Sequence, residues 1–324
     1  MPLQDYSTLL KLFESYLVSH EPAGVPDTLY QPMKYINQLG GKRIRPVLLL
    51  MAYNLWKEDV TPVLPAAMAL EYFHNFSLMH DDIMDEAPLR RGHRSVHQLF
   101  GRNSAILSGD AMLILCFHLL IEAGKKEQLG ELLVSMMAKT SLEICEGQQM
   151  DMDFEKLHSI SEHEYLEMIR KKTACLIGLS LRMGAVLANS DIIDANTLYE
   201  FGENLGLAFQ IRDDYLDVFG DPNLTGKQPG GDILQGKKNF LYVRTFNLLN
   251  LHEQENFKNL YLEANSTGDL QQVMKIYHSH GIKEYTQLTE KNYFTIALDK
   301  LKELKSIDPV ILNSLAREIF LRDH

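Results

Sequence analysis

The chain has few cysteines: three in 324 residues, at Cys116, Cys145 and Cys175. Their number is odd and their spacing is not that of metal ligands. We therefore interpret all three as buried thiols of a protein kept in a reducing compartment.

Positive charge is also scarce. The 32 lysines and arginines are outnumbered by 43 aspartates and glutamates, which gives a formal net charge of -11. Such a chain is not expected to bind nucleic acid or an anionic membrane non-specifically. If its substrate is a polyanion, local basic clusters and metal ions must hold it.

Long apolar runs are missing as well. The most apolar segment, residues 105–121, is interrupted by Asp110 and His118 and is too polar for an expected membrane span. The first residues, MPLQDYSTLL, contain no basic region followed by an apolar stretch and are not rich in arginine. We expect a cytoplasmic protein without a membrane span.

The alternation of apolar and polar residues that is typical of strands is absent, and helical periodicity fills nearly the whole chain. Ser161 and Glu164 are spaced as a capping box at the start of a long helix. We predict an all-α fold, one domain over residues 1–324, in which long antiparallel helices form a bundle around a central cavity. The expected helices cover roughly 5–19, 26–38, 42–56, 62–86, 103–122, 128–154, 161–189, 194–219 and 237–250, followed by four or five shorter ones.

One acidic motif, Asp-Asp-x-x-Asp, occurs twice, at residues 81–85 and 213–217. Each copy follows strongly apolar helical sequence, so we expect each at the end of a packed helix. The outer aspartates of a copy share one helix face, where like charges destabilise the helix unless a cation neutralises them. One copy is more often a solvated helix cap, but two favour a metal site. Carboxylates alone suit Mg²⁺, which shares its shell with water and substrate phosphates.

Three basic clusters supply the positive charge that the net balance lacks. In the first, residues 40–46 (GGKRIRP), two glycines allow close backbone approach, and Lys42 and Arg45 are expected on one helical face. A helix N-terminus with these side chains would cradle a diphosphate. The second is Arg90-Arg91, just after the first acidic motif, and arginine binds phosphate oxygens bidentately.

The third basic cluster follows the second acidic motif and contains Lys227, Lys237 and Lys238. Lys171-Lys172-Thr173 lies on another expected helix and can point into the same space. For Lys171 and Lys238 we favour a surface role, which is the commoner role of a lysine.

Together these segments resemble the trans-prenyl diphosphate synthases, the family of farnesyl and geranylgeranyl diphosphate synthases. The resemblance covers about residues 35–245 and rests on six motifs in order: GGKRIRP, HDDIMD followed by RRG, GQQMD, KKTA, FQIRDDYLDVFGD and GGDILQGKK. It implies a prenyltransferase that joins isopentenyl diphosphate to allylic diphosphates (dimethylallyl, geranyl or farnesyl), head-to-tail and in trans. It also implies a homodimer.

The resemblance assigns roles to particular residues. Three Mg²⁺ ions, replaceable by Mn²⁺, would be held with the substrate by Asp81, Asp82, Asp85, Asp213, Asp214 and Asp217. The allylic diphosphate would be contacted by Arg90, Lys172, Lys227 and Lys237. Isopentenyl diphosphate would be bound by Lys42, Arg45, His74 and Arg91. The dipoles that face the developing cation would belong to Thr173, Gln210 and the carbonyl of Lys172, while Gln148 and Asp151 match a nearby family element. The expected catalytic residues are Asp81, Asp85, Asp213, Lys172, Thr173 and Gln210.

His74 and Phe76 lie on the expected helix shortly before the first acidic motif. A histidine on an apolar helix is more often a core residue, but His74 precedes Asp81 by two helical turns, which favours a ligand role. In the family, residues before the first motif limit product length, and by resemblance Phe76 and Ser77 would do so. An aromatic residue there is similar to enzymes that stop at fifteen or twenty carbons.

Two other functions use related features. A terpene cyclase also combines an aspartate-rich motif with Mg²⁺ on an all-α fold, but its second metal motif normally mixes Asn, Ser or Thr with Glu. A non-catalytic regulatory subunit of a synthase usually lacks one acidic motif or the basic residues. Here both acidic motifs and the basic clusters are present.

Overall fold

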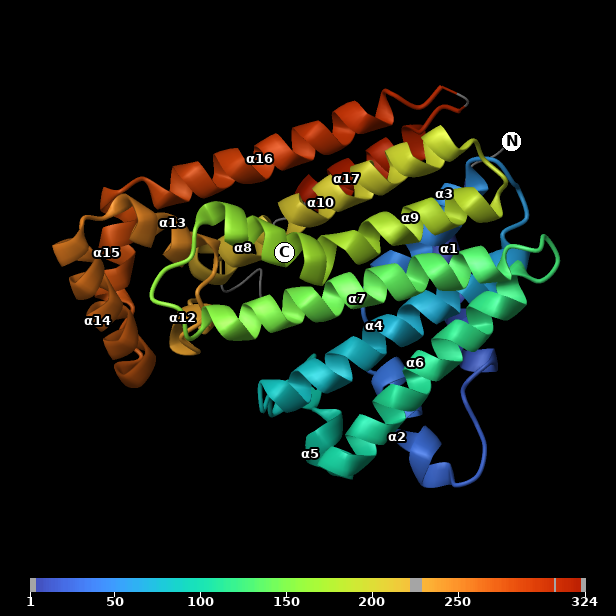
Figure 1. Ribbon diagram of the computed structural model, residues 1–324, viewed down its shortest axis with the longest axis horizontal. Coiled ribbons are helices and arrows are strands. Elements are labelled where there is room, and N and C mark those ends of the chain that lie inside the picture. The colour runs from blue at the N-terminus through green and yellow to red at the C-terminus, as the bar shows by residue number, and fades with distance from the viewer. Residues whose placement is uncertain (1–3, 222–228, 306, 322–324) are drawn as a thin grey trace. The chain divides into compact units, whose positions relative to one another are not determined.

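The computed structural model of the chain describes residues 4–221, 229–305 and 307–321 (Figure 1). The first half of the chain forms α1 (Tyr6–Ser19), α2 (Asp27–Gln38), α3 (Ile44–Asn54), the 3₁₀ turn η1 (Thr61–Val63), α4 (Leu64–Met84), strands β1 (Leu89–Arg90) and β2 (His93–Arg94), α5 (Val96–Phe100), α6 (Arg102–Gly124) and α7 (Gly130–Phe154). The second half forms α8 (Glu162–Ile169), the π-helical segment η2 (Arg170–Ala174), α9 (Cys175–Leu187), α10 (Ile192–Phe219), α12 (Gly231–Leu234), α13 (Phe240–Leu248), α14 (Leu251–Thr267), α15 (Gln271–Ser279), α16 (Ile282–Leu301) and α17 (Val310–Leu321). The all-α prediction is confirmed.

These elements form two compact units. Unit 1 comprises Met1–Ala138 and Ser180–Ala195, and unit 2 comprises Lys139–Leu179 and Asn196–His324. Helices α7, α9 and α10 each contribute residues to both units. The first acidic motif lies in unit 1 and the second in unit 2. A single functional domain over the whole chain stays a prediction.

In unit 1 the helices α4 and α6 run side by side (Figure 1). Both helices carry buried apolar side chains, such as Leu70 and Phe73 on α4 and Met112 and Cys116 on α6. A glycine permits the close approach, since a Cβ atom on Gly109 would lie 2.5 Å from the imidazole of His80. This packing fixes the end of α4, which carries the first acidic motif.

Among the described residues, α6 alone is long and apolar enough to cross a membrane, judged by length and composition. Core helices of other proteins pass the same test, and α6 packs against α2, α4 and α5. Its other face leaves Leu107, Ile114 and Ile121 between 50 and 69 % exposed.

In unit 2 the core beside the second acidic motif is aromatic. Phe240, Phe257 and Tyr277 are fully buried, and the rings of Phe257 and Tyr277 have centroids 6.2 Å apart. Burying one such side chain stabilises a fold by about 1.5–3 kcal/mol. The expected capping box is confirmed at α8, where the Ser161 and Glu164 side chains cap each other's backbone N–H groups. This core holds the start of α13 against α10.

Four local features differ from the sequence predictions. Strands β1 and β2 pair in antiparallel fashion, but two residues each are too few to show alternation. Helix α3 begins at Ile44 rather than residue 42, because Arg43 adopts a left-handed conformation with φ 46°. The expected helix 161–189 is interrupted by the π-helical segment. Cys145 is exposed, so the prediction that all three thiols are buried is wrong for this one.

Candidate active site

The first acidic motif ends α4, as the sequence predicted, and its three aspartates have different surroundings. Asp82 is fully buried, whereas Asp81 is partly exposed and Asp85 is exposed. The guanidinium of Arg90 donates to the Asp82 carboxylate, with 3.0 Å between Nε and Oδ1. The middle aspartate is thus held by a cation of the chain itself. The two outer carboxylates are the accessible pair.

The turn between β1 and β2 carries the arginines of the second basic cluster. Arg91 has a left-handed backbone, and its guanidinium donates to the carbonyl of Gly40. A Cβ atom on Gly41 would lie 2.9 Å from that guanidinium. The missing side chain at Gly41 therefore lets Arg91 lie against the Lys42 loop, and the expected diphosphate cradle stays a prediction.

The first basic cluster does not form the helical face that its spacing predicted. Lys42 precedes α3 and is exposed, so it does not share a helical turn with Arg45. Between them, Arg43 turns inward and pairs with Glu71, whose side chain is only 2 % exposed. A buried charge needs such a partner. Arg43 therefore has a structural role, whereas Lys42 is exposed at the surface.

His74 lies on α4 within the same group of basic residues. Its Nε2 atom is 3.3 Å from Nη1 of Arg45. Burial, followed by the positive charges of Arg45, Arg91 and Arg90, lowers the pKa of His74 well below its usual value. The imidazole is therefore neutral near pH 7 and adds no charge to a cluster that is already cationic.

The two residues expected to limit product length lie one turn further along α4. Phe76 is partly buried, and its ring meets those of Phe73 and His80 edge-on at centroid distances of 5.5 and 4.8 Å. Ser77 Oγ donates to the His74 carbonyl at 2.9 Å. Phe76 is thus braced on both sides, as a residue that limits a cavity would have to be.

Unit 2 contains a cavity of about 200 Å³ beside the second acidic motif. It is lined by Asp151, Tyr165, Met168, Ile169, Lys172, Thr173, Gln210, Asp213, Asp214, Asp232, Lys237, Lys238 and Asn239. Several candidates from η2, α10 and the segment before α13 therefore meet in one space. It combines carboxylates, ammonium groups and neutral dipoles.

A chain of hydrogen bonds runs along this cavity. Thr173 Oγ1 donates to Gln210 Oε1 at 3.3 Å, and Gln210 Nε2 donates to Asp214 Oδ1 at 3.2 Å. The other oxygen of Asp214 accepts from the Tyr165 hydroxyl at 2.5 Å and from the Phe240 N–H at 3.0 Å. Burial, and then the charge of Asp232, raises the pKa of Asp214 to about 8. This series of hydrogen bonds orients the Gln210 amide toward Thr173.

The remaining acidic and basic candidates have defined partners. Lys172 Nζ lies 2.5 Å from an Asp151 oxygen, so the expected nearness of the GQQMD element is confirmed. Asp217 Oδ2 accepts from the Asp232 N–H at 3.0 Å. Asp213 is exposed at the cavity, and Lys237 also lines it. Lys227 lies outside the described residues.

Lys171 and Lys238 behave differently from each other. Lys171 is paired with Glu146 at 2.7 Å near the surface, in keeping with the role we favoured for it. Lys238 donates to the carbonyls of Phe154 and Leu157, at 2.8 and 2.5 Å, and so caps the end of α7. The expected surface role of Lys238 is wrong, because carbonyls that end a helix need donors from elsewhere in the chain.

The carboxylates of the two acidic motifs are the candidate ligands for Mg²⁺. Over the ranges that the structure describes, no group of three or more His, Cys, Asp or Glu side chains is placed so that it could hold a metal ion by itself. The accessible donors are carboxylate oxygens on Asp81, Asp85 and Asp213, with Asp217 nearby. Within each unit, these few carboxylates suit an ion that keeps waters and takes its other ligands from a substrate's phosphates.

Tyr165, Asp232 and Asn239 line the cavity but were not predicted as site residues. Tyr165 is an aromatic at helical spacing, which most often means core. Asp232 stands in the GGDILQGKK segment, and that segment is the only signal that could have found it. Asn239 caps α13 through Tyr242 N–H and donates to Asp232 at 3.1 Å.

Comparison with known proteins agrees with this arrangement. The sequence model of the polyprenyl synthetase family matches residues 26–278. The chain is 38 % identical to a geranylgeranyl pyrophosphate synthase of Geoglobus acetivorans, over 96 % of this chain and 95 % of the other. It is 43 % identical to a short chain isoprenyl diphosphate synthase of Methanocaldococcus jannaschii, over 69 and 68 %. A crystal structure of a geranylgeranyl pyrophosphate synthetase from Pyrococcus horikoshii matches with a TM-score of 0.91 at 30 % identity, covering 98 % of both chains.

These matches define an all-α prenyltransferase. The chain belongs to the polyprenyl synthetase family, as the six ordered motifs predicted.

Proposed function

We propose that this prenyltransferase condenses isopentenyl diphosphate with allylic diphosphates in a Mg²⁺-dependent reaction, and that its main product is geranylgeranyl diphosphate. The cavity of unit 2 is the observation that carries this proposal, because it sets Lys172 and Lys237 beside Asp213 and the Thr173–Gln210 dipoles. The names of the relatives support the class of substrate and the product of twenty carbons.

The chemistry explains why these residue types are needed. The allylic C–O bond breaks with its electron pair leaving on the diphosphate, so negative charge grows there and an allylic cation remains. Lys172 and Lys237 would stabilise that charge, and the oxygens of Thr173 and Gln210 would face the cation. Mg²⁺ held by the outer aspartates Asp81, Asp85, Asp213 and Asp217 would supply further charge stabilisation. The isopentenyl double bond then forms the new C–C bond, and a proton is lost.

The basic cluster of unit 1 would bind the second substrate. Lys42 and Arg45 would contact isopentenyl diphosphate together with Arg91. The neutral His74 contacts Arg45 and would hold its guanidinium in place without adding charge. Arg90 would contribute through its hold on Asp82, in addition to the contact with the allylic diphosphate that the family resemblance implies.

Product length would be limited by Phe76, with Ser77 beside it. The edge contacts of Phe76 with Phe73 and His80 support this, since a braced ring resists displacement by a growing chain. Removing the ring would open space for another five-carbon unit, and each added buried methylene is worth about 0.8 kcal/mol.

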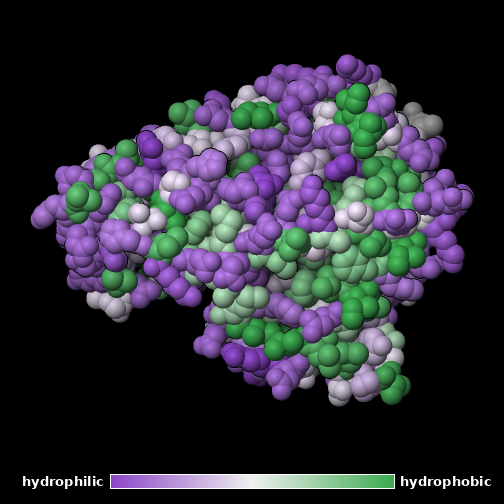
Figure 2. All heavy atoms as spheres, in the orientation of Figure 1, coloured by the Kyte–Doolittle hydropathy of each residue, from purple (hydrophilic) through white to green (hydrophobic). Residues whose placement is uncertain are grey.

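We further propose that the protein acts as a homodimer in the cytoplasm. Leu107, Ile114 and Ile121 are spaced seven residues apart on the outer face of α6 and form an exposed apolar stripe. Figure 2 shows apolar side chains gathered along this helix. Such a stripe suits burial against a second copy of the same chain.

Purified protein incubated with isopentenyl diphosphate and labelled dimethylallyl, geranyl or farnesyl diphosphate tests the function. Products of twenty carbons are expected, chelation should abolish turnover, and Mg²⁺ should restore it, with Mn²⁺ as a substitute. In the same assay Phe76→Ala should shift products to longer chains. A cyclised product, or turnover that survives exhaustive chelation, would contradict the proposal.

A further inference from the structure

The long helix that carries Lys172 and Thr173 is interrupted by a π-helical segment, Arg170–Ala174. The N–H of Cys175 donates to the carbonyl of Arg170, five residues back, instead of to that of Lys171. The Lys171 carbonyl accepts from the Cys175 thiol at 2.8 Å instead. A buried side chain therefore replaces the backbone bond that the wider turn displaces. Segments of this kind are often found at functional sites.

The wide turn lies where two proposed site residues need to project. Lys172 reaches Asp151 on α7, and Thr173 reaches Gln210 on α10, although the two are neighbours in sequence. Both side chains line the cavity of unit 2. In a regular helix adjacent residues are about 100° apart around the axis, so the wider turn changes where this pair points.

Two glycines let the helices on either side press against the segment. A Cβ atom on Gly147 of α7 would lie 2.5 Å from the Lys172 backbone nitrogen. One on Gly206 of α10 would lie 2.7 Å from the Ala174 Cα atom. The position of the segment is thus set by packing on both sides, and a shift of either helix would move Lys172 and Thr173.

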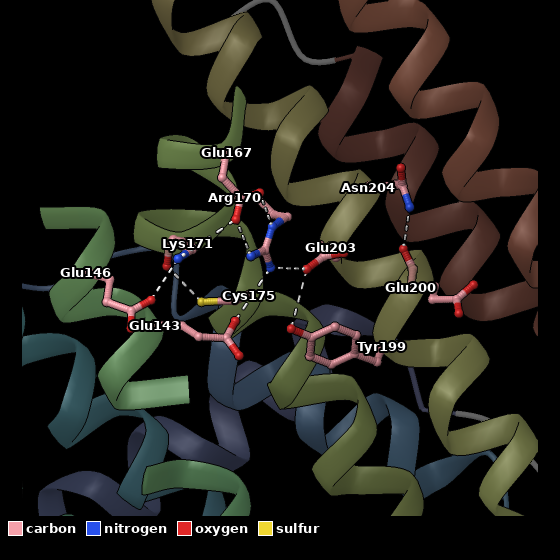
Figure 3. Close-up of polar contacts among 10 residues, drawn as sticks. All are labelled: Glu143, Glu146, Glu167, Arg170, Lys171, Cys175, Tyr199, Glu200, Glu203 and Asn204. Atoms are coloured by element: carbon pink, nitrogen blue, oxygen red, sulfur yellow. Dashed lines mark hydrogen bonds and ion pairs between the residues drawn. The ribbon is translucent and has the colours of Figure 1, made fainter. Parts of the chain in front are cut away.

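Arg170 joins the π-helical segment to α7, α8 and α10 (Figure 3). Its guanidinium makes two bonds of 2.7 Å to Glu167 on α8, in the bidentate geometry that arginine favours. Its Nη1 atom donates to Glu203 of α10 at 2.9 Å and reaches Glu143 of α7 at 3.5 Å. Figure 3 shows the arginine among these carboxylates, with Lys171 beside it, paired to Glu146 at 2.7 Å and reaching Glu167 at 3.9 Å. The Glu167 and Glu203 contacts raise the pKa of Arg170, and its side chain is 27 % exposed.

We propose that Arg170 is a positioning residue: by bridging α7, α8 and α10 it holds the π-helical segment so that Lys172 and Thr173 meet the substrate correctly. One side chain of the segment thereby contacts carboxylates on three helices, so its removal should change where the segment lies. A lysine could replace it only in part, because one ammonium group lacks the planar fork of donors with which arginine reaches several carboxylates. The inference rests on the proposed function.

The test compares Arg170→Met with Lys171→Met, which removes the neighbouring ion pair from the same segment. A misplacement of about 1 Å can cost about 100-fold in rate. We expect Arg170→Met to lower kcat about 100-fold, with KM for isopentenyl diphosphate changed less than about threefold. Arg170→Lys should recover part of the loss, and Lys171→Met should resemble the wild type. Glu203→Gln, which keeps an acceptor for Arg170 but removes one charge, should give a smaller loss of kcat in a folded protein.

Hydrogen exchange gives a readout that does not depend on turnover. Peptides covering residues 165–180 should exchange faster in Arg170→Met than in Lys171→Met, while the rest of unit 2 stays unchanged. An unchanged kcat, or exchange that rises equally across unit 2 with kcat lost only in proportion to unfolding, would overturn the inference. If the wild-type protein itself showed no turnover, the proposed function would fail. The exchange comparison would still decide whether Arg170 holds the segment.

Discussion

The two acidic motifs have the same sequence pattern but are built into the protein in different ways. In both, the middle aspartate is buried and the first is more accessible. In unit 1 the buried Asp82 is neutralised by a cation, Arg90. In unit 2 the buried Asp214 is held by neutral donors, from Tyr165, Gln210 and the Phe240 backbone.

This difference shows that a repeated motif does not imply a repeated environment. A carboxylate that is buried among neutral groups gains a proton more readily, and burial raises the pKa of Asp214 to about 8. In unit 1 several arginines gather near His74, and one of them, Arg90, pairs with Asp82. Unit 2 instead contains a cavity lined by both acidic and basic side chains, along which a series of hydrogen bonds runs. The following predictions test whether the units have separate tasks in one reaction.

The largest effect is expected from the accessible aspartates. Asp81→Ala and Asp213→Ala should each lower kcat by about 1000-fold or more, because each removes charge stabilisation worth several kcal/mol in the transition state. Steady-state kinetics at saturating Mg²⁺ measures this, with Asp110→Ala and Asp153→Ala as exposed controls in the two units. A large loss in only one of the two variants would show that one motif suffices.

A smaller effect should separate the two substrates. Lys42→Ala should raise KM for isopentenyl diphosphate about 10- to 100-fold, as expected for one lost charge-assisted hydrogen bond. Lys237→Ala should do the same for the allylic diphosphate. KM values for both substrates in both variants measure the split, and Lys57→Ala, on an exposed lysine of unit 1, is the control. Equal losses of affinity for both substrates in Lys42→Ala would end the assignment of one substrate to each unit.

The smallest effect concerns the cationic cluster of unit 1. The pKa of His74 is lowered in the folded protein, so the unfolded chain binds the proton more readily. The stability that this confers is present above about pH 6.5 and is lost as pH falls toward the folded-state pKa, by up to about 1.4 kcal/mol per pH unit. Denaturant unfolding between pH 7 and 5 should show that wild type loses more stability than His74→Gln. His252→Gln, which changes an exposed histidine, is the control. If the free energy of unfolding falls equally with pH in wild type and His74→Gln, the lowered pKa of His74 is refuted.

Local pattern was sufficient for the helices and for the placement of both motifs. The boundaries expected for α1, α2 and α7 fall within two residues of those observed, because apolar periodicity and caps are properties of short segments. The position of each Asp-Asp-x-x-Asp motif near a helix end follows from the same signals. The family resemblance then supplied roles that local pattern could not.

Tertiary packing decided which way the polar side chains turn. No pattern near residue 43 predicts that Arg43 points inward, because its partner Glu71 lies on another helix. Tyr165 was indistinguishable from a core aromatic until its hydroxyl was found on Asp214, 49 residues away.

The π-helical segment at Arg170 shows the same limit most clearly. Its sequence, RKKTA, fits a regular helix, and the expected helix ran through it. The wider turn is associated with contacts from Glu143, Glu203, Gly147 and Gly206, on helices distant in the chain. The sequence by itself determined where helices form and where both acidic motifs fall along them, since these depend on neighbours along the chain. Only the tertiary structure decided how those residues are aimed, since that depends on partners that folding brings together.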